Sequence, residues 1–105
     1  MAQHYRHDWG FNNSGVYNLQ WDAIRDDSVV VITASEGSGP NAQSPQRVVG
    51  DATFSIHNVA PHPGGVTFRV EIGHYVLTAS GDSGFAFSFL PWPDLLHLFT
   101  DFTVF

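Results

Sequence analysis

The chain has 105 residues and a formal net charge of −6 at pH 7, because ten Asp and Glu residues outnumber four arginines. It contains no cysteine and no lysine, which excludes disulfides, thiolate metal ligation, a cysteine nucleophile and Schiff-base chemistry. The four arginines are spread along an acidic chain and cannot form the basic surface that nucleic acid requires, so we expect no nucleic acid partner.

Length and composition predict one β domain over residues 1–105. Hydrophobic residues make up 43% of the chain, and nine Phe, three Trp and three Tyr can fill a core. The N-terminus lacks the apolar run of a signal peptide, and no segment approaches the roughly 18 apolar residues of a membrane span. We therefore expect a cytoplasmic protein with no membrane partner, with secretion by another route as the alternative. No motif predicts a cofactor or a metal site.

The first half of the chain alternates between irregular and extended segments. Residues 1–15 are rich in turn formers and rings and predict an irregular N-terminal segment. Alternating apolar and polar residues over 16–21 indicate a strand, which ends at the turn formers of 22–28. The β-branched run at 29–34 predicts a central strand covered on both faces. Residues 35–46 are polar, with Gly and Pro but no periodicity, and predict a long loop.

Residues 52–72 give the clearest geometric prediction. Apolar side chains recur at every second position on both sides of the proline- and glycine-rich residues 59–65, which is typical of a β-hairpin. Apolar residues of both arms must face one core, so the numbers of paired residues must add to an even sum. A register with a symmetric turn then gives these pairs: Ile56 with Phe68, Phe54 with Val70, His57 with Thr67, Ser55 with Arg69, and Thr53 with Glu71.

The second half predicts another hairpin and a last strand. Residues 75–79 and 85–89 are extended segments on either side of the turn formers at 80–84. Two prolines exclude a central strand over 90–94. Residues 95–98 fit one helical turn or a strand, and alternation over 98–105 predicts a strand that must be paired into the sheet. The chain is thus predicted to be all-β, an antiparallel β-sandwich of about seven to eight strands, with a small closed β-barrel as the alternative.

A ligand-binding module, most simply a lectin-like carbohydrate-binding one, is the first functional hypothesis. Sugars present apolar CH faces and hydroxyl edges, so their sites combine a flat ring with polar side chains. Trp9 with Asn12 and Asn13, and Trp92 with Asp94, offer that combination in predicted loops. The alternative is that either tryptophan only caps an open end of the core.

An enzyme that uses the polar face of the hairpin is the second hypothesis. His57 would be the general base, Arg69 would stabilise a developing anion, and Glu71 would orient Arg69 or act as the acid. A metal site built from His57, His62 and His74 is conceivable only if the turn folds back over the sheet. The alternative is a polar sheet face that simply meets water.

Self-assembly is the third hypothesis. Phenylalanines alternate over 85–89 and again over 99–105, which is more apolar strand surface than one small core absorbs. A homodimer would cover the surplus.

Overall fold

The computed structural model describes residues 2–37, 47–48, 51–80 and 84–105, and their regular structure is entirely β. The strands are β1 Gln3–Asn12, β2 Gly15–Gln20, β3 Val30–Gly37, β4 Arg47–Val48, β5 Thr53–His62, β6 Gly65–Ser80, β7 Gly84–Pro91 and β8 Leu96–Val104. The all-β prediction is confirmed. Within the described residues, no helix of sufficient length and apolarity to cross a membrane is found.

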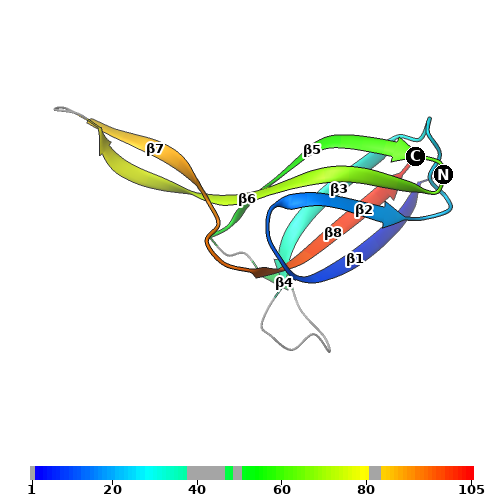
Figure 1. Ribbon diagram of the computed structural model, residues 1–105, viewed down its shortest axis with the longest axis horizontal. Helices are drawn as coiled ribbons and strands as arrows, with labels where there is room; N and C mark the ends of the chain where they lie inside the picture. Colours follow the sequence, from blue (N-terminus) through cyan, green and yellow to red (C-terminus); the bar gives the residue numbers. More distant parts are fainter. Residues whose placement is uncertain (1, 38–46, 49–50, 81–83) are drawn as a thin grey trace.

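Two antiparallel sheets form the fold (Figure 1). One has the strand order β1-β8-β3-β4, and the other has the order β2-β6-β5 with β7 added to β6. Their strand orders are open over the described residues, which confirms the sandwich rather than the closed barrel. Phe68 of β6 meets Phe102 of β8 edge to face across the core, with ring centroids 5.5 Å apart. Both rings are almost completely buried.

Strand β8 supplies the centre of the core from its place between β1 and β3. Leu98, Thr100, Phe102 and Val104 are all buried on its inner face, as their alternation predicted. The choice left open at 95–98 resolves as strand, because β8 already begins at Leu96 and pairs there with β1. The apolar end of the chain is paired on both sides, by β1 and by β3.

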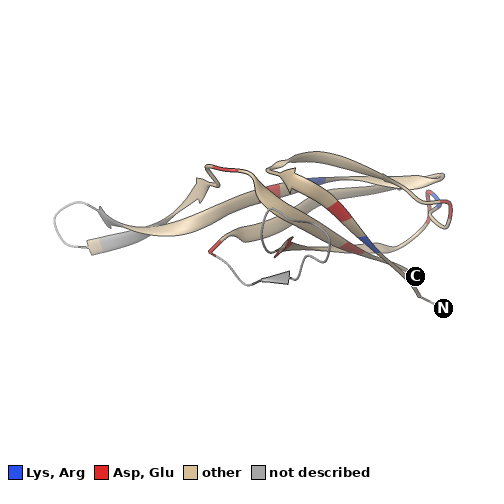
Figure 2. Ribbon diagram, turned by 90° about the horizontal axis from the view of Figure 1, so that it is seen from below, with Lys and Arg blue, Asp and Glu red and all other residues tan. Residues whose placement is uncertain are grey.

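The second predicted hairpin is an arm that leaves the sandwich (Figures 1 and 2). We define the arm as residues 73–80 of β6 together with β7. The hairpin is confirmed, but β6 runs as one strand of 16 residues instead of breaking after Ile72. Gly73 permits this passage, because a Cβ there would lie 2.4 Å from both the Leu90 carbonyl and the Phe89 ring. Over the described residues β7 pairs only with β6, which suits a strand that ends in Pro91.

The first hairpin is confirmed, but its predicted register is wrong by two residues. Ile56 lies opposite Val70 and His57 opposite Arg69, because the turn consists of only Pro63 and Gly64 and a β-bulge then separates His57 from Ala60. Asn58 within this bulge has a φ of 53°, in the left-handed region that Asn tolerates. Pairs next to the turn, such as His62 with Gly65, have odd sums, and the extra residue of the bulge in β5 restores even sums from His57 to Thr53. From Thr53 to His57 the numbers of paired residues still add to an even sum, as predicted, so the apolar residues of both strands share one face.

Three further predictions need correction. The expected irregular segment at residues 1–15 contains β1, because β8 supplies its hydrogen-bonding partners from Gln3 to Asn12. Strand β3 is not covered on both faces, since Val31 is 48% exposed while its neighbour Ile32 is buried. In the expected loop over 35–46, Ser35–Gly37 extend β3 instead, and 38–46 lie outside the described residues.

Candidate functional site

The polar hairpin face brings the three proposed catalytic residues together on exposed strand positions. His57 lies directly opposite Arg69, and its Nε2 is 3.0 Å from Oε2 of Glu71. The side chains of His57 and Glu71 are 46% and 55% exposed, and Arg69 is exposed too. Water screens charges at such positions, which weakens any stabilisation of a developing anion. The geometry is that of a solvated ion pair beside a guanidinium.

The three histidines of the conceivable metal site have separate surroundings. His62 Nε2 lies 3.1 Å from Oδ1 of Asn18 at the tip of the hairpin. His74 packs edge to face against Trp92, with ring centroids 5.5 Å apart. Within the described part of the chain, no group of three or more His, Asp or Glu side chains could hold a metal ion.

Trp9 and Asn12 belong to strand β1 rather than to a binding loop. The Trp9 indole packs edge to face on Tyr17 at 5.0 Å, and its Nε1 donates to Oγ1 of buried Thr100 at 2.7 Å. Asn12 donates from Nδ2 to the Trp9 carbonyl at 2.9 Å. These contacts satisfy the polar atoms of Trp9 inside the fold. The arrangement fits the alternative in which this tryptophan closes the core.

Asn13 lies next to Trp92 and Asp94, although it is 79 and 81 positions away from them in sequence. Nδ2 of Asn13 donates to the Trp92 carbonyl at 3.0 Å and to the Asp94 carbonyl at 2.8 Å. Asn13 precedes β2, whereas the other two residues lie between β7 and β8. One amide therefore fixes the segment that carries the candidate ring and carboxylate.

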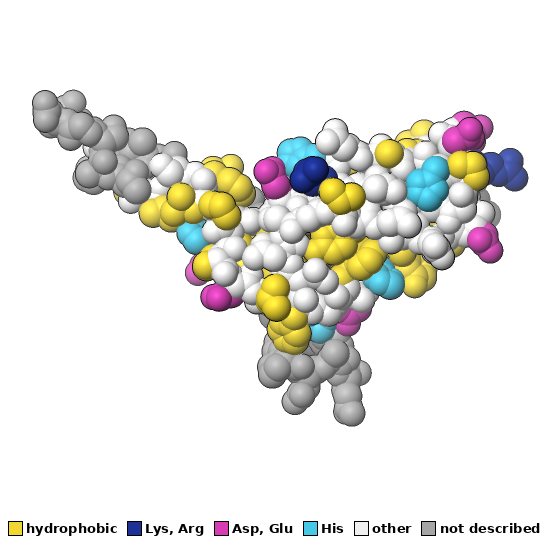
Figure 3. Space-filling view, viewed as in Figure 1, with side chains coloured by type: hydrophobic (Ala, Val, Ile, Leu, Met, Phe, Trp, Pro, Cys, Tyr) yellow, Lys and Arg dark blue, Asp and Glu magenta, His cyan; other side chains and the backbone are white. Residues whose placement is uncertain are grey.

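A hollow of about 510 Å³ opens beside this segment, and we call it the Trp92 hollow. Its lining includes the rings of His74, Tyr75 and Trp92 and the carboxylates of Asp51 and Asp94. Tyr75 is 62% exposed, whereas Trp92 is half-buried and its buried Nε1 has no hydrogen-bond partner among the described residues. Figure 3 shows hydrophobic side chains gathered near the base of the arm. Tyr75 and Leu90, which are both exposed, belong to the pairs of β6 and β7 residues next to Gly73. The hollow combines flat apolar surfaces with hydrogen-bond acceptors.

A second hollow of about 370 Å³ shares Trp92 and Asp94 with the first, and we call it the Phe11 hollow. Phe11, Glu36 and His97 also line it. Sequence reasoning missed His97, because alternation places it on the outer face of β8, where a polar residue is expected to meet water. The imidazole is instead 2% exposed.

Asp8 and two aromatic rings account for the burial of His97. Nε2 of His97 lies 2.6 Å from Oδ1 of Asp8, and the imidazole stacks on Phe99 with centroids 4.8 Å apart. The Phe11 ring lies 5.4 Å from it on the neighbouring strand. No sequence motif marks this cluster, since it depends on the register between β1 and β8.

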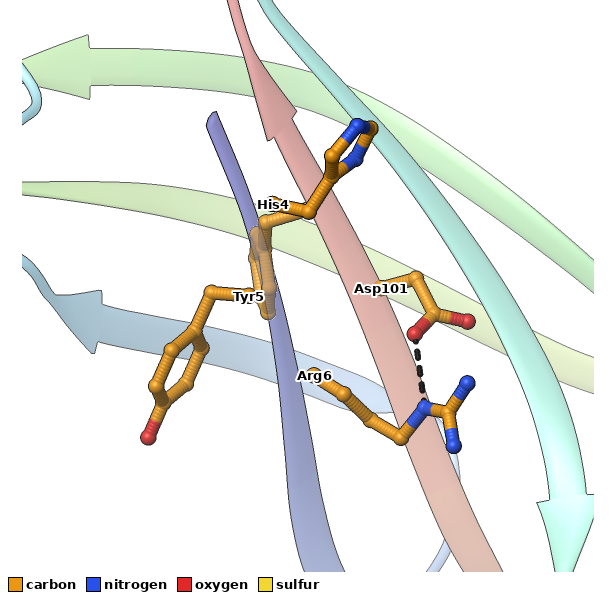
Figure 4. Close-up of a pocket in the computed structure, with 5 residues that line it drawn as sticks. His4, Tyr5, Arg6 and Asp101 are labelled. Atoms are coloured by element: carbon orange, nitrogen blue, oxygen red, sulfur yellow. Dashed lines mark hydrogen bonds and ion pairs between the residues drawn. The ribbon is translucent and has the colours of Figure 1, made fainter. Parts of the chain in front are cut away.

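A further hollow of about 390 Å³ lies on β1 and β8, lined by His4, Tyr5, Arg6, Asp101 and Phe102 (Figure 4). Nε of Arg6 donates to Oδ1 of Asp101 at 3.0 Å, and the arginine side chain is 61% exposed. In Figure 4 the Tyr5 ring points away from this ion pair, on the other side of β1. The Tyr5 ring therefore does not lie next to the charged groups of this hollow.

Comparison with known proteins gives no relative for this fold and site. No family model matches the chain, and neither the curated proteins nor the solved structures contain a match. The functional argument therefore depends on the geometry of the site alone.

Proposed function

We propose that this chain is a carbohydrate-binding module that holds a neutral sugar unit in the Trp92 hollow. The observation that carries the proposal is the hydrogen bonding of Asn13 to the Trp92–Asp94 segment, which fixes a ring and a carboxylate at the edge of one hollow. The CH face of a sugar would pack on the rings of Trp92 and Tyr75. Its hydroxyls would donate to the carboxylates of Asp51 and Asp94.

Three properties of the hollow support a sugar over other small molecules. Two carboxylates disfavour acidic ligands, and no Arg lies among the described lining residues to offset them. Tyr75 is accessible to a ligand, because the residue is 62% exposed. The Trp92 segment is fixed by two hydrogen bonds, which lowers the ordering cost of binding.

A glycan array followed by fluorescence titration tests the proposal. We expect a neutral oligosaccharide to shift tryptophan emission, and the shift to disappear in Trp92→Phe while Trp9→Phe retains it. Asp94→Asn keeps an acceptor but removes its charge, so it should weaken binding by about five- to tenfold, the difference of roughly 1 kcal/mol between a hydrogen bond to a charged group and one to a neutral group. The matched control is Glu71→Gln on the hairpin face, which should leave affinity unchanged. Equal binding by Tyr75→Ala, Asp94→Asn and the unchanged protein would refute the proposed site.

Self-association through the arm is a second candidate function, because the arm has no charged residue and, over the described residues, its strand β7 pairs only with β6. Residues 73–80 and 84–91 contain no Asp, Glu, Lys or Arg, and Figure 2 shows no charged residue on the described part of the arm. Tyr75, Leu77 and Phe89 are 62%, 54% and 40% exposed. A ribbon of two strands is marginally stable in water, and a second copy could pair with the open edge of β7.

Light scattering after size-exclusion chromatography tests this candidate. We expect a dimer whose population rises with protein concentration and falls in Leu77→Asn. The control is Val31→Asn, which places the same polar group on another exposed valine of the sandwich body. A monomer at millimolar concentration would exclude the candidate.

A further inference from the structure

The ladder between β6 and β7 ends beside the Trp92 hollow with an incomplete pair. Gly73 pairs with Pro91, and one position further the Trp92 amide donates to the Ile72 carbonyl at 3.0 Å. In a complete antiparallel pair of this kind, the Ile72 amide would donate in return to the Trp92 carbonyl. Each of these two groups instead bonds to a side chain of the turn between β1 and β2. Ile72 and Trp92 therefore exchange one hydrogen bond where strand pairing offers two.

Asn13 and Ser14 supply the substitutes for the missing bond. Oγ of Ser14 accepts from the Ile72 amide at 2.8 Å and donates to the Ile72 carbonyl at 3.3 Å. Nδ2 of Asn13 donates to the Trp92 carbonyl at 3.0 Å. One hydroxyl can both accept and donate, since it holds one proton and two lone pairs. The donor and the acceptor of the interrupted ladder are thus both satisfied, which matters because Ile72 is 1% exposed and an unpaired amide there would be costly.

We propose that Ser14 is a positioning residue of the Trp92 hollow, an inference that rests on the carbohydrate function proposed above. Its hydroxyl binds the Ile72 amide and so keeps the Trp92 carbonyl outside the ladder. Trp92 then lines the hollow together with Tyr75 and Asp94 instead of extending β7. Ser14 itself is not among the residues that line the hollow, so it acts on a bound sugar only through Ile72 and Trp92.

Loss of the Ser14 hydroxyl would set two donors in competition for one carbonyl. The Ile72 amide, left without its acceptor, would donate to the Trp92 carbonyl that Asn13 binds. The segment after Pro91 would then divide between two arrangements, one in the ladder and one at the hollow. A hydrogen bond of ordinary strength shifts such an equilibrium by about fivefold. Sugar binding needs the arrangement at the hollow, so it should weaken by up to the same factor.

Three serine variants test the inference by fluorescence titration with a neutral oligosaccharide selected on the glycan array. Ser14→Ala should bind it about two- to fivefold more weakly than the unchanged protein, whereas Ser14→Thr, which keeps a hydroxyl, should restore the affinity. Ser28→Ala is the matched control, because Oγ of Ser28 accepts from the Arg25 amide at 2.8 Å in the loop after β2. This control removes the same type of hydrogen bond outside the lining of the hollow, so the affinity should not change. The titrations use conditions in which urea unfolding shows every variant to be folded.

NMR of the free protein tests the interrupted ladder without a sugar. A scalar coupling across a hydrogen bond, from the amide nitrogen of Ile72 to the carbonyl carbon of Trp92, should be absent from the unchanged protein and appear in Ser14→Ala. Absence of this coupling from Ser14→Ala, equal sugar affinity of Ser14→Ala and the unchanged protein, or an equal loss of affinity in Ser28→Ala would each overturn the inference and leave the carbohydrate proposal standing. Absence of glycan binding by the unchanged protein would overturn the carbohydrate proposal and the inference with it.

Discussion

Replacement of Asn13 by alanine should both destabilise the fold and loosen the Trp92 segment. The amide donates two hydrogen bonds to backbone carbonyls, at 3.0 Å to Trp92 and 2.8 Å to Asp94. A typical intramolecular hydrogen bond contributes about 0.5–1.5 kcal/mol, so the two together give roughly 1–3 kcal/mol. Asp94 is exposed, so water can satisfy its carbonyl after the substitution. We therefore expect a loss of about 1–2 kcal/mol in the free energy of unfolding.

Urea unfolding followed by tryptophan fluorescence measures this loss as a lower transition midpoint with an unchanged slope. Asn13→Asp sharpens the experiment, because aspartate has the shape of asparagine but cannot donate when ionised. Its second oxygen would face two carbonyl oxygens, so the aspartate variant should be at least as unstable as the alanine variant at pH 7. Asn12→Ala is the matched control, since it removes a single side-chain donor to the Trp9 carbonyl.

The binding readout separates local order from global stability. Under conditions where all variants are folded, Asn13→Ala should weaken sugar binding several-fold, whereas Asn12→Ala should not. An Asn13→Asp protein as stable as the unchanged chain would refute the reasoning, because two lost donors and a new charge would then have no cost. Unchanged sugar affinity in Asn13→Ala would show that the Trp92 segment is positioned by other contacts.

Three further predictions concern the packing and ionisation of single residues. Gly37→Ala should lower the melting temperature, because a Cβ at this position would lie 2.2 Å from Cε2 of Phe99, and overpacking of this kind costs about 1–3 kcal/mol. Burial raises the pKa of Tyr17 above its ordinary value of 10.0, in spite of its hydrogen bond to a backbone carbonyl. The free energy of unfolding that this hydroxyl contributes is therefore fully present below pH 10 and is lost as the pH rises further. Urea unfolding should show this loss in the unchanged protein but not in Tyr17→Phe. His57→Ala should change the free energy of unfolding by about 1 kcal/mol or less, because its ion pair with Glu71 is exposed, and a loss of 3 kcal/mol would contradict the solvated geometry.

Strand positions were predictable wherever one face of a strand meets the core. The alternation at Leu98, Thr100, Phe102 and Val104 predicted β8, because a side-chain period of two leaves one way to bury that face. The same rule predicted both hairpins and the even sum of paired residues near Thr53. It did not predict the register, since the alternation reveals neither the position of the two-residue turn nor the bulge that restores the even sum beyond it.

Strand β1 escaped prediction because its sequence carries rings and turn formers on both faces. Tyr5, His7 and Trp9 alternate with charged or polar residues, but Gly10 and the asparagines beyond it resemble a loop. Pairing with β8 supplies the backbone hydrogen bonds that make this segment extended. The strand propensity of a sequence is a weak guide where a strand distant in sequence supplies the backbone hydrogen bonds.

The candidate site was only half predictable, for the same reason. Trp92 between two prolines and the neighbouring Asp94 are visible as a combination of ring and carboxylate in the sequence. The sequence pattern grouped Asn13 with Trp9, but Asn13 hydrogen-bonds to the backbone of Trp92 and Asp94, near the other end of the sequence. Contacts of this kind depend on how strands are ordered in the sheets, which periodicity does not specify.

The topology explains why the two hollows lie at residues 92–95. The chain must leave the arm on one sheet and enter β8 at the centre of the other, and Pro93 in the crossing segment has no N–H to donate to either ladder. Its backbone needs partners elsewhere, so the Trp92 amide donates to the Ile72 carbonyl at 3.0 Å and its carbonyl accepts from Asn13. Because these hydrogen bonds hold the segment without a neighbouring strand, the space beside it stays open. The hollows are therefore a consequence of the crossing, and Trp92 and Asp94, which line both of them, are the residues on which the proposed sugar binding depends.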